Sequence, residues 1–99
     1  MTKLTKKQTK AMTDLVKTCL ENVFAETSKG DHLALSFAKA GAVAVEDLIW
    51  AGWTVAAAEK TFDELVAKGL IHEEWYGAFF SLTGDWDTIR RDDLASRVK

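Results

Sequence analysis

Residues 45–53 read VEDLIWAGW, residues 54–71 read TVAAAEKTFDELVAKGLI and residues 72–83 read HEEWYGAFFSLT. The first segment predicts a short helix over residues 45–50, because Glu46 and Asp47 fall in a first turn where the helix dipole favours negative charge. Gly52 then allows a tight turn that a side chain would hinder. A short helix followed by a turn is the starting point for interpreting the rest of the chain.

The second segment predicts a longer helix over residues 54–68. Thr54 suits the N-cap position, and Lys68 followed by Gly69 is a stop signal. The apolar residues at helical spacing, expected on the buried side, are Val55, Ala58, Phe62, Leu65 and Val66. The two helices and their turn therefore form one unit over residues 45–68.

Two short strands are expected after this unit. Residues 70–72 predict one strand and residues 78–83 its partner, with residues 73–77 as the connection. Residues 83–85 (Thr-Gly-Asp) then break the second strand. The strands together predict a hairpin over residues 70–83.

An amphipathic helix is predicted upstream, over residues 6–26. Thr5 suits its N-cap, and residues 27–30 are expected to break it. Its apolar stripe, expected to be buried, contains Met12, Leu15, Val16, Cys19 and Val23. The stripe therefore predicts one buried face on this helix.

Two further short helices complete the prediction. One is capped by Asp31 and ends at Gly41, with four residues available for burial: Leu33, Leu35, Phe37 and Ala38. The other covers residues 87–98 and is strongly charged, with Ile89, Leu94 and Val98 on its apolar side. Its Arg90-Arg91 and Asp92-Asp93 pairs are expected to be solvated and to form local ion pairs.

The order of these elements has a parallel among known folds. A helix, a tight turn and a second helix packed across it define the helix-turn-helix. With Trp53 placed to fill the gap between the helices, and with the KGLI ending that leads into a hairpin, residues 45–83 resemble the small winged helix-turn-helix domains of bacterial and phage regulators. The resemblance implies a mainly α fold with a small β-hairpin (α+β). The whole chain, residues 1–99, would be a single such domain with an N-terminal helical pair and a short C-terminal helix.

Composition favours a cytoplasmic protein without a membrane span. Hydrophobic residues make up 47% of the 99 positions, enough for a core. The single cysteine, Cys19, excludes an internal disulfide framework and fits a reducing compartment. No apolar run reaches the roughly 18 residues that a membrane helix needs.

The charge distribution conflicts with the usual activity of the fold. Residues 1–20 carry five lysines and one aspartate, whereas residues 44–84 carry two cations and seven anions. The respective net charges are +4 and −5. Because neutralisation of phosphates by Lys and Arg supplies most non-specific DNA affinity, the acidic segment favours a protein partner over DNA.

The protein-binding hypothesis places the contact at the connection of the hairpin. Its residues are acidic and aromatic: Glu73, Glu74, Trp75 and Tyr76. Aromatic side chains are enriched at protein interfaces, and Trp75 is either exposed there or folded back onto the helix before it. Under this hypothesis the chain is a non-enzymatic regulator of the adaptor, inhibitor or DNA-mimic type.

The alternative hypothesis is a DNA-binding transcriptional regulator. By resemblance, the second helix of the motif enters the major groove and presents Thr54, Ala56, Ala57, Lys60, Thr61 and Asp63. Lysines near the N-terminus would add phosphate contacts: Lys3, Lys6, Lys7 and Lys10. A homodimer through the first helix would double these lysines and offset the acidic motif.

Catalysis and cofactor binding have little support in the sequence. His32 and His72 lack metal-ligand spacing with Cys19, and no phosphate-binding glycine loop is present. Cys19 falls on an apolar stripe, which predicts packing in the core. We therefore expect neither an enzyme nor a bound cofactor or metal.

Overall fold

The computed structural model describes residues 3–30, 32–74 and 79–97. Its elements are, in chain order, α1 (Lys6–Lys29), α2 (His32–Lys39), β1 (Ala42–Val43), α3 (Val45–Trp50), α4 (Val55–Ala67), β2 (Ile71–Glu74), β3 (Phe79–Leu82) and α5 (Gly84–Arg97). The strands form one antiparallel sheet with β3 between β1 and β2. The fold is therefore a mainly helical α+β domain with a small three-stranded sheet.

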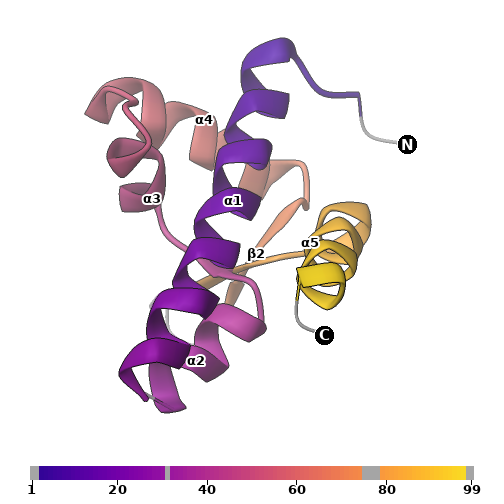
Figure 1. Ribbon diagram of the computed structural model, residues 1–99. Coiled ribbons are helices and arrows are strands. Elements are labelled where there is room, and N and C mark those ends of the chain that lie inside the picture. Colours follow the sequence, from indigo (N-terminus) through magenta and orange to yellow (C-terminus); the bar gives the residue numbers. More distant parts are fainter. Residues whose placement is uncertain (1–2, 31, 75–78, 98–99) are drawn as a thin grey trace.

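Helix α1 forms the centre of the molecule, with α3 and α4 on one side and α5 on the other (Figure 1). It contacts α2, α3, α4, α5 and β1. Its predicted stripe is buried, and apolar residues of the other elements pack with it: Val43, Leu48, Ala58, Phe62, Leu65, Ile71 and Leu82. The core is therefore built around α1. Full burial of each large apolar side chain in it contributes roughly 1.5–3 kcal/mol to folding.

Helix α1 is longer than the sequence predicts, because the expected break after residue 26 is absent. The hydroxyls of Thr27 and Ser28 donate to carbonyl oxygens four residues earlier, at 2.7 and 3.2 Å. Both groups are thus satisfied inside the helix. Gly30, with φ of +74°, is the C-cap. The predicted cap of the next helix, Asp31, lies outside the described residues.

The sheet differs from the prediction at both edges. Strand β1 is not predicted, because its two residues are too few for an alternating pattern; it pairs with β3 and places Ala42 opposite Ser81. Strand β2 extends to Glu74, which lies opposite Phe79. Glu73 and Glu74 therefore belong to a strand, and their assignment to the connection was wrong.

The buried side of α5 was also assigned incorrectly. The helix begins at residue 84 and not at residue 87. Ile89 is 51% exposed, whereas Trp86 and Leu94 pack against the core. Arg90 lies between these two on the same face of the helix and is 0% exposed. The prediction of a solvated arginine pair is therefore wrong for Arg90.

Several apolar residues predicted to be available for burial lie outside the core. Leu33 is 68% exposed and Val55 is 56% exposed. Each lies in the first turn of its helix, and the buried residues of α4 follow only from Ala58 onwards. Phe37 is 36% exposed, and Val98 is outside the described residues.

Candidate functional site

Helices α3 and α4 pack against each other across a four-residue connection, residues 51–54. Gly52 adopts a φ of +104°, and Trp53 N donates to the carbonyl of Leu48 at 3.0 Å. Thr54 accepts the N–H of Ala57 on its hydroxyl oxygen at 3.2 Å, which confirms its predicted N-cap role. A glycine turn and a capped second helix therefore position the residues predicted to bind DNA.

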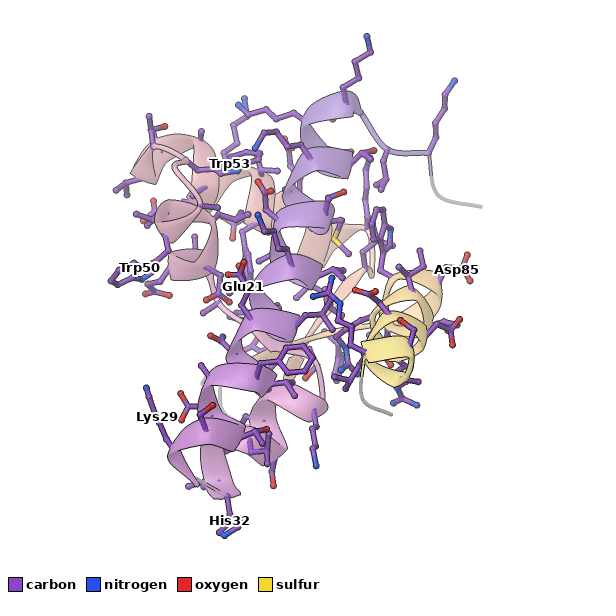
Figure 2. The ribbon with its side chains drawn as sticks, viewed as in Figure 1. Glu21, Lys29, His32, Trp50, Trp53 and Asp85 are labelled. Atoms are coloured by element: carbon purple, nitrogen blue, oxygen red, sulfur yellow. The ribbon has the colours of Figure 1, made fainter. Side chains whose placement is uncertain are left out.

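Trp53 joins this turn to α1 (Figure 2). Its Nε1–H donates to Asp14 Oδ2 at 2.8 Å, and Lys10 Nζ donates to the same oxygen at 2.9 Å. The ammonium groups of Lys7 and Lys10 lie 6.0 and 5.4 Å from the centre of the indole ring, within cation–π range. The side chain expected between α3 and α4 thus anchors their turn to the first helix.

The carboxyl group of Asp14 is ionised at neutral pH as part of this junction. Burial raises the pKa of Asp14, but the hydrogen bonds from Lys10 and Trp53 lower it by a larger amount. The pKa of Asp14 is therefore lower than its ordinary value. The charge of Lys10 is thereby partly neutralised within the chain. Lys10 consequently offers less net positive charge to a partner than its sequence position indicates.

The predicted DNA-contact residues of α4 do not share one surface. Lys60 and Thr54 are exposed, and Ala57 is half-buried. Thr61 is only 1% exposed and packs inside the domain, so its assignment to a DNA-facing surface was wrong. It was misassigned because position 61 lies three residues after the buried Ala58, on the same side of the helix.

Two of the N-terminal lysines, Lys7 and Lys10, lie at the turn that precedes α4. Lys3, Lys6, Lys7 and Lys10 are all exposed, and two of them reach the Trp53 ring. Lys68 at the end of α4 donates to the carbonyl of Lys3 at 2.9 Å. The structure therefore places the basic segment beside α4, but the exposed charges of α4 itself remain mixed: Glu59, Lys60 and Asp63.

The predicted protein-binding residues are described only in part. Glu73 is exposed on β2, and the backbone of Glu74 continues that strand. Trp75 and Tyr76 lie outside the described residues, so the aromatic part of that hypothesis stays a prediction.

A different tryptophan forms the most exposed aromatic surface among the described residues. Trp50, the last residue of α3, is 86% exposed and points away from the molecule (Figure 2). It borders a hollow of about 470 Å³ between α1 and α3, which we call the Trp50 face: Asp14, Lys17, Thr18, Glu21, Asn22, Asp47, Trp50 and Ala51. Three acids and one cation line this face; because Lys10 pairs with Asp14, the remaining net charge is −1.

The exposure of Trp50 follows from the way α3 packs. Leu48 is fully buried, and a residue two positions later is rotated by about 200° around a helix, to the opposite side. The carboxylate of Asp47 accepts a hydrogen bond from the backbone N–H of Ala44 at 2.9 Å. Asp47 forms no ion pair with a cation in the described part of the chain. Burial raises its pKa above the ordinary value.

Cys19 is a buried residue of the core. The thiol of Cys19 is 1% exposed, and burial raises its pKa to about 12, so a nucleophilic thiolate is disfavoured. The thiol donates to the carbonyl of Ala42 at 3.5 Å, which confirms the predicted packing role. Among residues 3–30, 32–74 and 79–97, no group of three or more His, Cys, Asp or Glu side chains is arranged to hold a metal ion.

Comparison with protein-family models, with curated proteins and with solved structures gives no match for this chain. Within the part of the chain that the structure describes, none of the helices combines the length and apolar character needed to cross a bilayer.

Proposed function

We propose that this chain is a winged helix-turn-helix module that binds a protein partner and acts as an adaptor or inhibitor. The order of α3, a glycine turn, α4 and the β2–β3 pair supports this assignment. Strand β1 adds a third strand to the sheet without interrupting that order. Fold alone does not determine function, so the proposal depends on one surface.

The observation that carries the proposal is the exposure of Trp50. Tryptophan is among the residues that contribute most binding energy at protein interfaces. Removing a large apolar side chain from water contributes roughly 1.5–3 kcal/mol, and 86% of Trp50 is available for such burial. A partner that covers Trp50 would therefore gain a substantial part of its affinity from one residue.

The charge around Trp50 indicates the chemistry of that partner. With Asp14 paired to Lys10, the Trp50 face carries a net charge of −1, and the adjacent exposed Glu46 adds a second negative charge. Opposite potentials attract two surfaces and disfavour like-charged partners. We infer a partner with a basic surface, which includes DNA-binding proteins whose groove an acidic inhibitor would occupy.

A second candidate function, DNA binding, is favoured by the position of two lysines. Lys7 and Lys10 lie over Trp53, next to the start of α4, where a helix N-terminus favours a phosphate. The predicted homodimer through the first helix would double them. Because the apolar stripe of α1 is buried within the chain, such a dimer would have to use the exposed side of α1.

Affinity capture with matched variants tests the favoured function. The immobilised protein, its Trp50→Ala variant and its Leu33→Ala variant are each exposed to extract from the source cells, and the retained proteins are identified. Leu33 is an exposed apolar residue on a different helix, α2, and is the control. We expect a partner that wild type and Leu33→Ala retain, that Trp50→Ala loses, and that moderate salt weakens.

A parallel titration on random duplex DNA tests the second candidate. We expect no binding at moderate salt. Tight, steeply salt-dependent binding that is lost in a Lys7→Gln/Lys10→Gln variant, together with equal capture by the Trp50 and Leu33 variants, would refute the favoured function and support a DNA-binding regulator.

A further inference from the structure

A second hollow, on the other side of α1, goes beyond the proposed function. It measures about 670 Å³ and lies between the C-terminal half of α1, α2 and α5. We call it the α5 groove. Its apolar part is formed by Val23, Phe24, Leu35, Leu94 and Ala95. This volume lies within the range of about 300–1,000 Å³ that is typical of small-molecule sites.

The α5 groove is cationic. Its described lining includes Lys39, Arg90, Arg91 and Arg97 and contains no acidic side chain. Arg97 is paired with Asp93, which lies outside the lining, at 3.2 Å. Lys39 forms no ion pair with any acid that the structure describes. The groove therefore has unneutralised positive charge beside an apolar surface.

The carboxylate of Asp87 forms ion pairs with two of these cations, Arg90 and Arg91. Asp87 Oδ1 accepts from Arg90 Nε at 3.1 Å and from Nη2 at 2.8 Å, and its Oδ2 lies 2.8 Å from Arg91 Nε. Two guanidinium groups and one carboxylate leave a net charge of +1. Together with Lys39 this makes two positive charges available to an anion.

Arg90 also has an unused hydrogen-bond donor. The residue is 0% exposed, and its Nη1 has no hydrogen-bond partner in the part of the chain described. Buried donors are nearly always paired, so the hydrogen-bonding capacity of this guanidinium is only partly satisfied within the described chain. A carboxylate is the acceptor that best matches a guanidinium.

We propose that the α5 groove binds a small amphipathic carboxylate. The carboxylate pairs with the exposed Arg91 and Lys39, with the buried charge of Arg90 beneath it, and the apolar part of the ligand covers Val23 and Leu94. An inorganic anion would leave the apolar lining of the groove exposed to water. A neutral apolar molecule would leave the cationic side chains of the groove without a counter-ion. The combination of both surfaces selects a ligand that has both properties.

The test uses octanoate as the probe, with 1-octanol as its neutral counterpart and acetate as its counterpart without the chain. Binding to the full-length protein is measured by calorimetry and by NMR chemical-shift perturbation, below the concentration at which octanoate forms micelles. We expect saturable octanoate binding with shifts confined to α1, α2 and α5. Binding of octanol or acetate is expected to be at least about tenfold weaker.

Two matched pairs of exposed variants locate the site without disturbing the core. Ala95→Glu places a carboxylate in the groove and Ala95→Gln an amide of similar size; only the first is expected to weaken octanoate binding, by at least about tenfold. Lys39→Gln is expected to weaken it several-fold, whereas Lys29→Gln, whose lysine pairs with Glu26 outside the groove, is not.

Three outcomes would overturn the proposal. One is no saturable octanoate binding by the wild type, and another is equal binding of octanol. The third is a concentration-dependent dimer, seen by sedimentation, that Ala95→Glu dissociates and octanoate does not, because the groove would then be covered by a second copy of the chain. None of these outcomes bears on capture through Trp50, so the two proposals fail independently.

Discussion

Trp50 and Arg90 lie in helices on opposite sides of α1 and reverse the usual preferences of their residue types. Tryptophan is mostly buried and arginine is rarely buried completely, yet Trp50 is 86% exposed and Arg90 is 0% exposed. The first belongs to an acidic surface next to α3, and the second lies beneath a cationic groove next to α5. Both arrangements are unfavourable for the isolated domain, which is why we associate both with binding.

The difference arises from where each helix contacts α1. In α3, Leu48 occupies the core position, so Trp50 is directed outwards. In α5, Trp86 and Leu94 face the core, and Arg90 lies between them on the same face. The residue's position relative to its helix neighbours, and not its own polarity, determined its burial in both cases.

The largest expected effect on stability comes from Arg90. Arg90→Ala should lower the free energy of unfolding by about 3–5 kcal/mol, because it breaks a buried ion pair and leaves a space. Arg90→Met fills much of that space with apolar atoms and should be clearly less destabilising. Urea unfolding of both variants measures the difference; equal stability of wild type and Arg90→Ala would contradict the buried position of the side chain.

Gly41 tests the packing around Arg90. A Cβ added at Gly41 would lie 3.0 Å from Arg90 Nε and 3.0 Å from Asp87 Oδ1, at a φ of +82°. Gly41→Ala should therefore cost about 1–3 kcal/mol. Gly30→Ala is the control, because its φ is +74° but nothing lies within 4 Å of the added carbon. Similar losses for both variants in thermal or urea unfolding would mean that the Arg90 contact contributes nothing.

Two acids of the Trp50 face should respond to pH with opposite signs. The pKa of Asp14 is lowered in the folded protein, so its ionised form stabilises the fold above its unfolded pKa, and that stability is lost as pH falls through the folded pKa. Asp14→Asn should therefore cost about 1 kcal/mol at pH 7 and progressively less in acid.

The pKa of Asp47 is raised in the folded protein, chiefly by burial. Its contribution is therefore complete below the unfolded pKa and is lost as pH rises through the folded pKa. Asp47→Asn keeps an oxygen that can accept the Ala44 N–H and should be neutral or stabilising at pH 7. Unfolding measured from pH 2 to 7 compares the two variants; a loss at pH 7 for Asp47→Asn that matches Asp14→Asn would contradict the opposite signs.

The smallest expected effect on stability comes from Trp50. Because 86% of its surface is already in water, Trp50→Ala should change the free energy of unfolding by no more than about 0.5 kcal/mol. The same urea experiment as for Arg90→Ala gives the direct contrast between the two residues. A loss above about 1.5 kcal/mol would show that Trp50 is a packing residue and would remove the basis of the protein-binding proposal.

Local signals in the sequence determined most of the elements. The periodic stripe of α1, the Thr54 cap and the Gly52 turn are each specified by residues within a few positions, so α1, α3 and α4 were predicted close to their observed bounds. The exceptions depend on partners distant in sequence. Strand β1 exists only because β3 pairs with it.

The candidate surfaces also combine properties that the sequence specifies with properties that depend on tertiary contacts. The uneven charge of the chain is a property of composition, and the sequence alone determined it. The burial of Thr61, the exposure of Trp50 and the enclosure of Arg90 were decided by tertiary structure. Periodicity specifies which residues of a helix share a face, but only the packing of helices around α1 decides which face water reaches.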